Sequence, residues 1–293
     1  MTSVPALFSR DGVADKDERR EIARVVARES AETIAAPWRG AGVGALSRLL
    51  RPAADLVSRR FLDYDRALGD LGPLAGARWI IEREIASLEV RGGERVPSQG
   101  PLLVVANHPG VSDAVALLAA MRRDDAWIVT AEFPFLRALR HASRRFLFVP
   151  DDRDGGRTAL WQVVARLRAA EAVLLFPAGG LEADPELAPL EASRSLATWS
   201  RSLGLVARRA PGTRVLPAAV SGALSRGAFD HALARRRTPL RERQRMAALL
   251  QLSVARYRRV RVTVRFGAPI ESGDGVDLQE AVRERMRLLL PAV

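Results

Sequence analysis

Residues 102–121 read LLVVANHPGVSDAVALLAAM, and this stretch decides the fold. Its first five residues form an uninterrupted apolar run, which is typical of a strand buried on both faces. Its last eight residues have the apolar composition of a buried helix, and Pro109-Gly110 predicts a turn between the two. We therefore expect His108 where a strand leads into a helix, at the end of a sheet where open α/β folds place their sites.

A second residue of this stretch, Asp113, follows His108 by five positions. Ser112 is a good N-cap, so Asp113 is expected in the first helical turn, after a bend that lets its carboxylate fold back onto the imidazole. A carboxylate on one ring nitrogen fixes the tautomer and raises the basicity of the other, which makes His108 a candidate general base. A plain capped turn is the alternative, because the helix dipole alone favours an aspartate at this position.

Strand and helix patterns alternate along the chain after residue 102. Further strands are predicted at 126–130, 146–149, 172–176, from 215, and at 259–266. Helices are predicted at 158–170, 196–209 and 276–290. The alternation predicts an α/β fold with a mainly parallel sheet flanked by helices. Residues 1–75 are expected to form an N-terminal helical region that precedes this α/β domain.

Residues 107–113 resemble the His-x4-Asp motif of the glycerolipid acyltransferase superfamily, typified by 1-acylglycerol-3-phosphate acyltransferase. There the motif usually reads Asn-His-x4-Asp, and Asn107, His108 and Asp113 occupy these positions. Further segments resemble the family's other blocks in order and spacing: 131–136 with 146–153, then 174–180, then 215–220. The resemblance covers residues 100–221 and implies the glycerolipid acyltransferase fold, so residues 76–293 are expected to form an acyltransferase-like domain.

The third block departs from the family's usual Phe-Pro-Glu-Gly-Thr, because it reads Phe-Pro-Ala-Gly-Gly with Ala178 at the glutamate position. This form resembles the hemolysin-like branch, which includes lyso-ornithine lipid acyltransferases. In the typical branch the block helps to bind a phosphate-bearing acceptor, so the resemblance does not extend to glycerol-phosphate specificity. Glu182 lies four residues further on and is expected to be an ordinary exposed loop residue; the alternative is that it substitutes for the missing glutamate.

The resemblance implies an enzyme, an O-acyltransferase of phospholipid biosynthesis. It would move a fatty acyl group from a thioester donor (acyl-CoA or acyl carrier protein) to a hydroxyl of a lysophospholipid or related lysolipid, with no cofactor. His108 and Asp113 are the predicted catalytic residues, with backbone N–H groups of the third block as oxyanion donors. Arg153 is the candidate for binding an anionic group, ahead of Arg157. The predicted substrate-binding residues are Asn107, Arg153, Phe176, Pro177, Gly179 and Gly180.

The composition limits the partners. The chain has no cysteine, and its three histidines are far apart in sequence, so no metal site is expected. The net charge is +12, and arginines are dense in residues 235–261, where leucines and a methionine lie between them. A basic amphipathic helix there would suit an anionic membrane surface, and a solvated face is the alternative. No zinc-finger or base-stacking pattern points to nucleic acid.

The chain start lacks a secretory signal, and no window reaches the roughly 18 apolar residues of a spanning helix. A cytoplasmic protein, peripheral on the inner face of the cell membrane, is therefore expected. An α/β hydrolase is a rival class, but the sequence has no Gly-x-Ser-x-Gly elbow. A non-catalytic basic protein that binds membranes or nucleic acid on an acyltransferase scaffold is the other alternative. Ala178 favours it, and the intact His108 and Asp113 argue against it.

Overall fold

The computed structural model describes residues 14–35, 42–152, 154–200, 202–271 and 277–291. The chain divides into two compact units, residues 1–62 and 63–293. The first unit contains α1 (Ala14–Ala35) and most of α2 (Val43–Leu71), so this part of the chain is helical as predicted. The predicted boundary at residue 75, between a helical region and the acyltransferase-like domain, remains a prediction.

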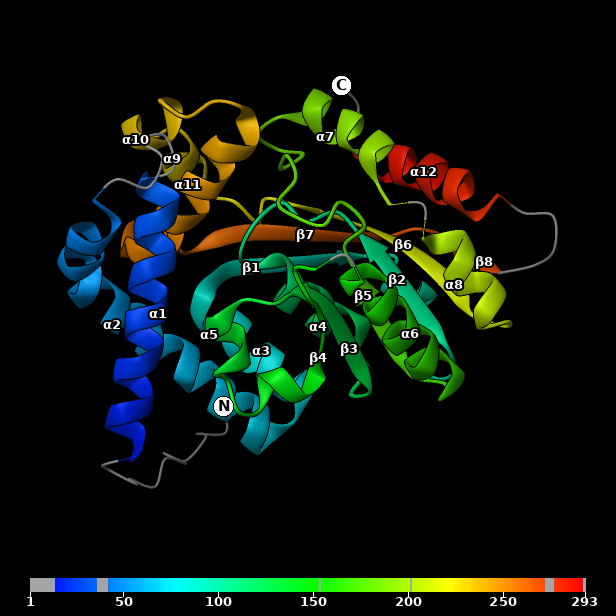
Figure 1. The fold of residues 1–293 in the computed structure, drawn as a ribbon. Coiled ribbons are helices and arrows are strands. Elements are labelled where there is room, and N and C mark those ends of the chain that lie inside the picture. Colours follow the sequence, from blue (N-terminus) through cyan, green and yellow to red (C-terminus); the bar gives the residue numbers. More distant parts are fainter. Residues whose placement is uncertain (1–13, 36–41, 153, 201, 272–276, 292–293) are drawn as a thin grey trace, which may run out of the picture. The chain divides into compact units, whose positions relative to one another are not determined.

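The second unit is built on a sheet that has eight strands within the described residues (Figure 1). Their order is β1-β7-β6-β2-β5-β3-β4, and β8 pairs with β6. All pairings are parallel except those of β6 with β7 and with β8, so the predicted mainly parallel sheet is confirmed. The strands are β1 (Ile85–Arg91), β2 (Leu102–Ala106), β3 (Ala126–Ala131), β4 (Phe146–Val149), β5 (Ala172–Leu175), β6 (Arg214–Ser221), β7 (Val260–Phe266) and β8 (Ile270–Glu271).

Helices cover both faces of this sheet. Side chains of α3 and α4 join the apolar cluster on one face, and side chains of α6, α8 and α12 join the cluster on the other. The helices are α3 (Pro73–Glu84), α4 (Asp113–Met121), α5 (Pro134–Arg137), α6 (Gly155–Arg168), α7 (Pro189–Ser195), α8 (Leu203–Arg209), α9 (Arg226–Phe229), α10 (Ala232–Arg235), α11 (Leu240–Ser253) and α12 (Leu278–Leu289). Short 3-10 turns are η2 (Gly93–Arg95), η3 (Ala142–Arg145), η4 (Leu196–Thr198) and η5 (Ala255–Tyr257).

The position of β2 inside the sheet explains why its sequence is apolar without interruption. It lies between β6 and β5, and its side chains alternate between the two apolar clusters. Val104 packs in the cluster on one face of the sheet, and Leu103 and Val105 pack in the cluster on the other. A strand covered on both faces has no position for a polar side chain. The strand ends at Ala106 and α4 begins at Asp113, so the prediction that His108 lies in the turn between a strand and a helix is confirmed.

The basic segment 235–261 is not the amphipathic helix that its composition suggested. It is divided among the end of α10, α11, η5 and the start of β7. The apolar residues within α11 face the protein, since Met246, Ala247 and Ala248 are buried. Arginines of this segment also take intramolecular partners, as in the ion pair of Arg243 with Asp230 at 3.0 Å. No helix among the described residues combines the length and the apolar character that a membrane span requires.

Candidate active site

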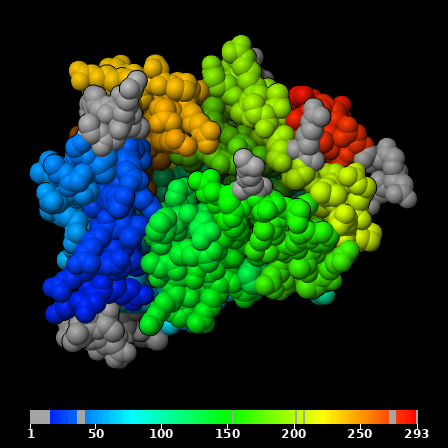
Figure 2. Space-filling view, viewed as in Figure 1, coloured from blue at the N-terminus to red at the C-terminus, as the bar shows by residue number. Residues whose placement is uncertain are grey.

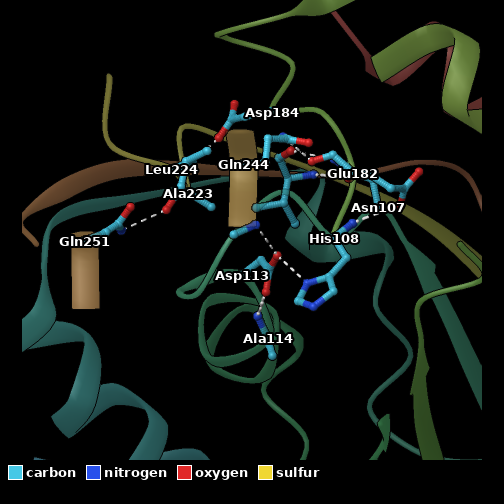
Figure 3. Close-up of polar contacts among 12 residues, drawn as sticks. Asn107, His108, Asp113, Ala114, Glu182, Asp184, Ala223, Leu224, Gln244 and Gln251 are labelled. Atoms are coloured by element: carbon cyan, nitrogen blue, oxygen red, sulfur yellow. Dashed lines mark hydrogen bonds and ion pairs between the residues drawn. The ribbon is translucent and has the colours of Figure 1, made fainter. Parts of the chain in front are cut away.

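The side chains of His108 and Asp113 meet at the turn between β2 and α4. His108 Nδ1 lies 2.8 Å from Asp113 Oδ2, so the predicted return of the carboxylate onto the imidazole is present (Figure 3). The N–H of Gly110 also donates to Oδ2, at 2.9 Å, and the N–H of Ala114 to Oδ1, at 2.6 Å. Ser112 occupies the N-cap position as predicted, but its side chain makes no capping hydrogen bond. Asp113 is thereby fixed to face one ring nitrogen.

The turn itself depends on a glycine. A Cβ on Gly110 would lie 3.0 Å from the carbonyl oxygen of Ala223, in the loop after β6, so the two backbones approach closely only because no side chain intervenes. Asn107 fastens the same turn to β6: its Nδ2 donates to Val220 O at 2.9 Å and its Oδ1 accepts from Val220 N at 2.8 Å. Its amide therefore holds the end of β2, and its predicted substrate contact remains a prediction.

The environment of His108 favours a proton on Nδ1 and a free lone pair on Nε2. The carboxylate of Asp113 accepts from Nδ1, and the His108 side chain keeps 29% of its surface exposed while that of Asp113 keeps 1%. Burial lowers the pKa of His108, but the charge and hydrogen bond of Asp113, with the charge of Glu182, outweigh it and raise the pKa above its usual 6.5. A basic, partly accessible imidazole suits proton abstraction.

The third block lies beside this imidazole. The ring of Phe176 stacks on that of His108, with centroids 4.6 Å apart and planes inclined by 27°. Pro177 is buried, and its carbonyl accepts the N–H of Ser200 at 3.0 Å. The N–H of Gly179 donates to Phe176 O at 3.1 Å within a turn, so it is already engaged and is a weaker oxyanion donor than predicted.

An arginine that sequence reasoning placed only in the basic segment lies over the third block. A Cβ on Gly180 would collide with the guanidinium of Arg241, so the glycine makes room for that group. Arg241 is exposed, and within the described residues its guanidinium has no hydrogen bond or ion pair. Arg153, the predicted anion-binding residue, lies outside the described residues, and Arg157 is exposed on α6.

Glu182 is the residue that sequence reasoning misjudged most. It was expected to be exposed, and it is 5% exposed. Its Oε2 accepts the N–H of His108 at 3.0 Å, and its own N–H donates to His108 O at 2.7 Å. The expectation failed because the residues around Glu182 in sequence do not indicate burial, while its partners are distant in sequence: His108 precedes it, and Ser195, Trp199 and Gln244 follow it. Burial raises its pKa above the usual range, against the opposing effect of its hydrogen bonds.

Asp184 was also missed, although it lies in the same loop. It is fully buried, and it accepts the N–H groups of Gly222 and Leu224 at 2.9 and 3.0 Å. Burial raises the pKa of Asp184 to about 6. These bonds tie the loop after β5 to the loop after β6, on which Gly110 packs. No group of three or more histidine, aspartate or glutamate side chains in the described part of the chain could hold a metal ion.

A comparison with known protein families agrees with the motif. The family described as Acyltransferase matches residues 87–221, a range that contains the His108–Asp113 turn and the third block. Among solved structures, the chain is similar to the crystal structure of the 1-acyl-sn-glycerophosphate (LPA) acyltransferase, PlsC, from Thermotoga maritima, with 15% identity and a TM-score of 0.45 over 92% of this chain and 94% of that chain. No curated protein matches. The residues that carry the His108–Asp113 turn and the third block therefore lie in a segment that matches the Acyltransferase family.

Proposed function

We propose that this protein is an acyltransferase of the glycerolipid acyltransferase superfamily, which moves a fatty acyl group from a thioester, acyl-CoA or acyl carrier protein, to a hydroxyl of a lysolipid. The observation that supports it best is the 2.8 Å contact of His108 Nδ1 with Asp113 Oδ2, which leaves Nε2 free to accept a proton. This reaction needs one base and no protein nucleophile, because the substrate hydroxyl attacks and the thioester is already activated. The intact pair also favours the enzyme over a non-catalytic binding protein.

The proposed reaction has two steps, in which His108 first takes a proton from the hydroxyl and then gives it to the leaving thiolate. Nε2 of His108 takes the hydroxyl proton while the hydroxyl oxygen bonds to the thioester carbonyl carbon, and the carbonyl electron pair moves to its oxygen. The electron pair on the oxygen then re-forms the carbonyl as the carbon–sulfur bond breaks, and the leaving thiolate receives the proton from Nε2. Asp113 stabilises the imidazolium formed between the steps, as a buried carboxylate on the other nitrogen does. The N–H of Gly180 is the candidate oxyanion donor in the third block.

Arg241 is proposed to bind the anionic group of a substrate. It lies against Gly180, in the block that stacks on His108, and carries no partner among the described residues. The block also lacks the acidic side chain that is usual in the family it resembles, since Ala178 stands at that position. Arginine is suited to planar contacts with phosphate and carboxylate oxygens. The anion belongs either to the lysolipid head group or to the donor's carrier.

Labelled acyl transfer to a panel of acceptors tests this function. The purified protein should convert at least one of lysophosphatidic acid, lyso-ornithine lipid and a neutral monoacylglycerol to the acylated product, with release of one free thiol per product. Arg241→Gln should raise the KM of the anionic substrate about ten- to a hundredfold, the value of one charge-assisted contact. Arg245→Gln, one turn along α11 and already paired with Glu242, is the matched control. No product with any acceptor and either donor would reject the proposal.

Association with anionic membranes remains a proposal for the protein's location. Arg235 and Arg236 are exposed beside Leu233, which keeps 49% of its surface, and Figure 2 shows this segment in yellow-orange on the outer surface. Each arginine near an anionic surface contributes about 1 kcal/mol, so changing residues 235–237 to glutamine should weaken vesicle binding roughly a hundredfold. The arginine-to-glutamine variant at positions 20, 24 and 28 removes the same charge from α1 and is the control.

Co-sedimentation with vesicles decides this prediction. Binding should require anionic lipid and should be lost at 1 M salt, where the screening length is about 3 Å. Equal loss in the two triple variants would show that only net charge matters. Equal binding to neutral and anionic vesicles would show that the arginines form only a solvated face.

A further inference from the structure

Glu182 occupies both backbone hydrogen-bonding groups of His108. The carboxylate accepts the His108 N–H at 3.0 Å, and the Glu182 N–H donates to the His108 carbonyl at 2.7 Å. The two residues are 74 positions apart in sequence, and Figure 3 shows them face to face above the α4 helix. The backbone N–H and carbonyl of His108 are therefore both held by one residue from another part of the chain.

The other groups of Glu182 are held by three further residues. Its Oε1 accepts the Nε1–H of Trp199 at 2.7 Å and the hydroxyl of Ser195 at 2.8 Å. Its carbonyl accepts from Gln244 Nε2 of α11 at 2.5 Å. Trp199 is 2% exposed and packs in the apolar cluster on the α6 and α8 face of the sheet. Glu182 thus connects the position of His108 to the packed core and to α11.

Burial raises the pKa of Glu182, but the groups that contact its carboxylate donate hydrogen bonds to it and oppose that rise, so they favour its charged form. The indole N–H of Trp199 and the backbone N–H of His108 are donors only, so each carboxylate oxygen must accept. A negative charge held at this point stabilises a protonated imidazole, and it acts in the same direction as Asp113 in raising the pKa of His108. The other charged groups around the third block are Arg241 over Gly180 and the buried Asp184.

We propose that Glu182 is a positioning residue for the general base, which fixes His108 for proton transfer and supplies a second negative charge after Asp113. The expected change in kcat rests on the proposed function. The expected change in the pKa of His108 does not, because it can be measured without any acyl transfer. A general base must lie within hydrogen-bond reach of the proton it takes, and a displacement of about 1 Å can cost a hundredfold in rate. A merely structural glutamate would lower stability without changing the titration of His108.

Glu182→Gln tests the proposal, because it keeps the shape and removes the charge, while its NH₂ group must also face a donor in place of one acceptor oxygen. We expect kcat to fall about ten- to a hundredfold with KM little changed. The pKa of His108, followed by NMR of the ring, should move to lower pH. The chain has three histidines, so loss of one ring signal in His108→Ala assigns the resonance. Glu182→Asp keeps the charge but is shorter, and it should lower kcat while leaving the pKa of His108 nearer to the wild-type value.

Two control variants distinguish an effect of Glu182 on His108 from a general loss of protein stability. Trp199→Phe removes one donor to Oε1 and should destabilise the protein, yet the raised pKa of His108 should persist because the carboxylate remains. Asp184→Asn removes a carboxyl that is buried in the same loop but bonded to Gly222 and Leu224. It should alter stability and leave the His108 titration in place, although Asp184 itself titrates near pH 6.

The outcomes also distinguish this inference from the proposed function. A folded Glu182→Gln with wild-type kcat and an unchanged pKa of His108 would overturn the positioning role, as would loss of activity in strict proportion to loss of stability in all four variants. If the wild-type protein transferred no acyl group, the proposed function would fail. The NMR titration would still decide whether Glu182 acts on His108.

Discussion

Replacing His108 with alanine is expected to lower kcat by about 10²–10⁴, the range that a general base contributes. The fold should survive, because the buried Asp113 retains the N–H groups of Gly110 and Ala114 as partners. KM should change little, since the imidazole acts on the reacting hydroxyl and not on the bulk of the substrate. Initial rates of labelled acyl transfer, with circular dichroism as the check on folding, measure this effect.

His231→Ala is the matched control for that substitution. His231 lies at the start of α10, where its Nδ1 accepts the N–H of Leu233 at 3.2 Å, and the proposed reaction has no part for it. The control should retain the wild-type rate. A folded His108→Ala enzyme that turns over at the wild-type rate would remove His108 from the mechanism and leave the His108–Asp113 contact as a capped turn.

Asp113→Asn is expected to cost a similar factor for a different reason. Both carboxylate oxygens now accept: Oδ2 from His108 and Gly110, Oδ1 from Ala114. An asparagine has one oxygen, so either its NH₂ group faces the N–H of Ala114, or it faces Nδ1 and forces the ring proton onto Nε2. The second arrangement blocks the base, and the loss of a correct tautomer can reach about 10⁴ in kcat.

The double variant shows whether the two residues act as one unit. If Asp113 works through His108, then His108→Ala with Asp113→Asn should be about as slow as His108→Ala alone, because groups that act together are strongly non-additive. Rates that fall by the product of the two single effects would mean that Asp113 contributes independently, for example by holding the turn that admits substrate.

Local sequence patterns predicted β2 and the turn that carries His108 and Asp113, but they did not predict the buried residues that contact this turn. The run 102–106 could be assigned as a strand because a strand covered on both faces must be apolar throughout, and the Pro109-Gly110 turn limited where Asp113 could lie. Glu182 could not be assigned, because Ser195 and Trp199 lie 13 and 17 residues further on and nothing in its own loop indicates burial. A contact that depends on tertiary packing has no local sequence signature.

The segment 235–261 shows a local pattern that does not identify its own environment. Its alternation of arginine and leucine is compatible with a membrane-facing helix, but the same apolar residues also suit packing against the protein, and the sequence does not distinguish these two environments. In the structure Met246 is buried and Arg243 is paired, while Arg241 lies over Gly180. Composition indicated a basic surface without indicating which arginine lies near the candidate active site.

The pH dependence of kcat/KM, measured for the wild-type enzyme and for Asp113→Asn, tests most directly whether neutral His108 is the base. Activity requires the unprotonated ring, and Asp113 and Glu182 hold the pKa of His108 above its usual 6.5. Wild-type kcat/KM should therefore fall tenfold per pH unit below a pKa that lies above 6.5, and the residual activity of Asp113→Asn should show this limb at lower pH. A wild-type profile that is flat between about pH 5.5 and 8, or a limb that Asp113→Asn does not move, would contradict the account.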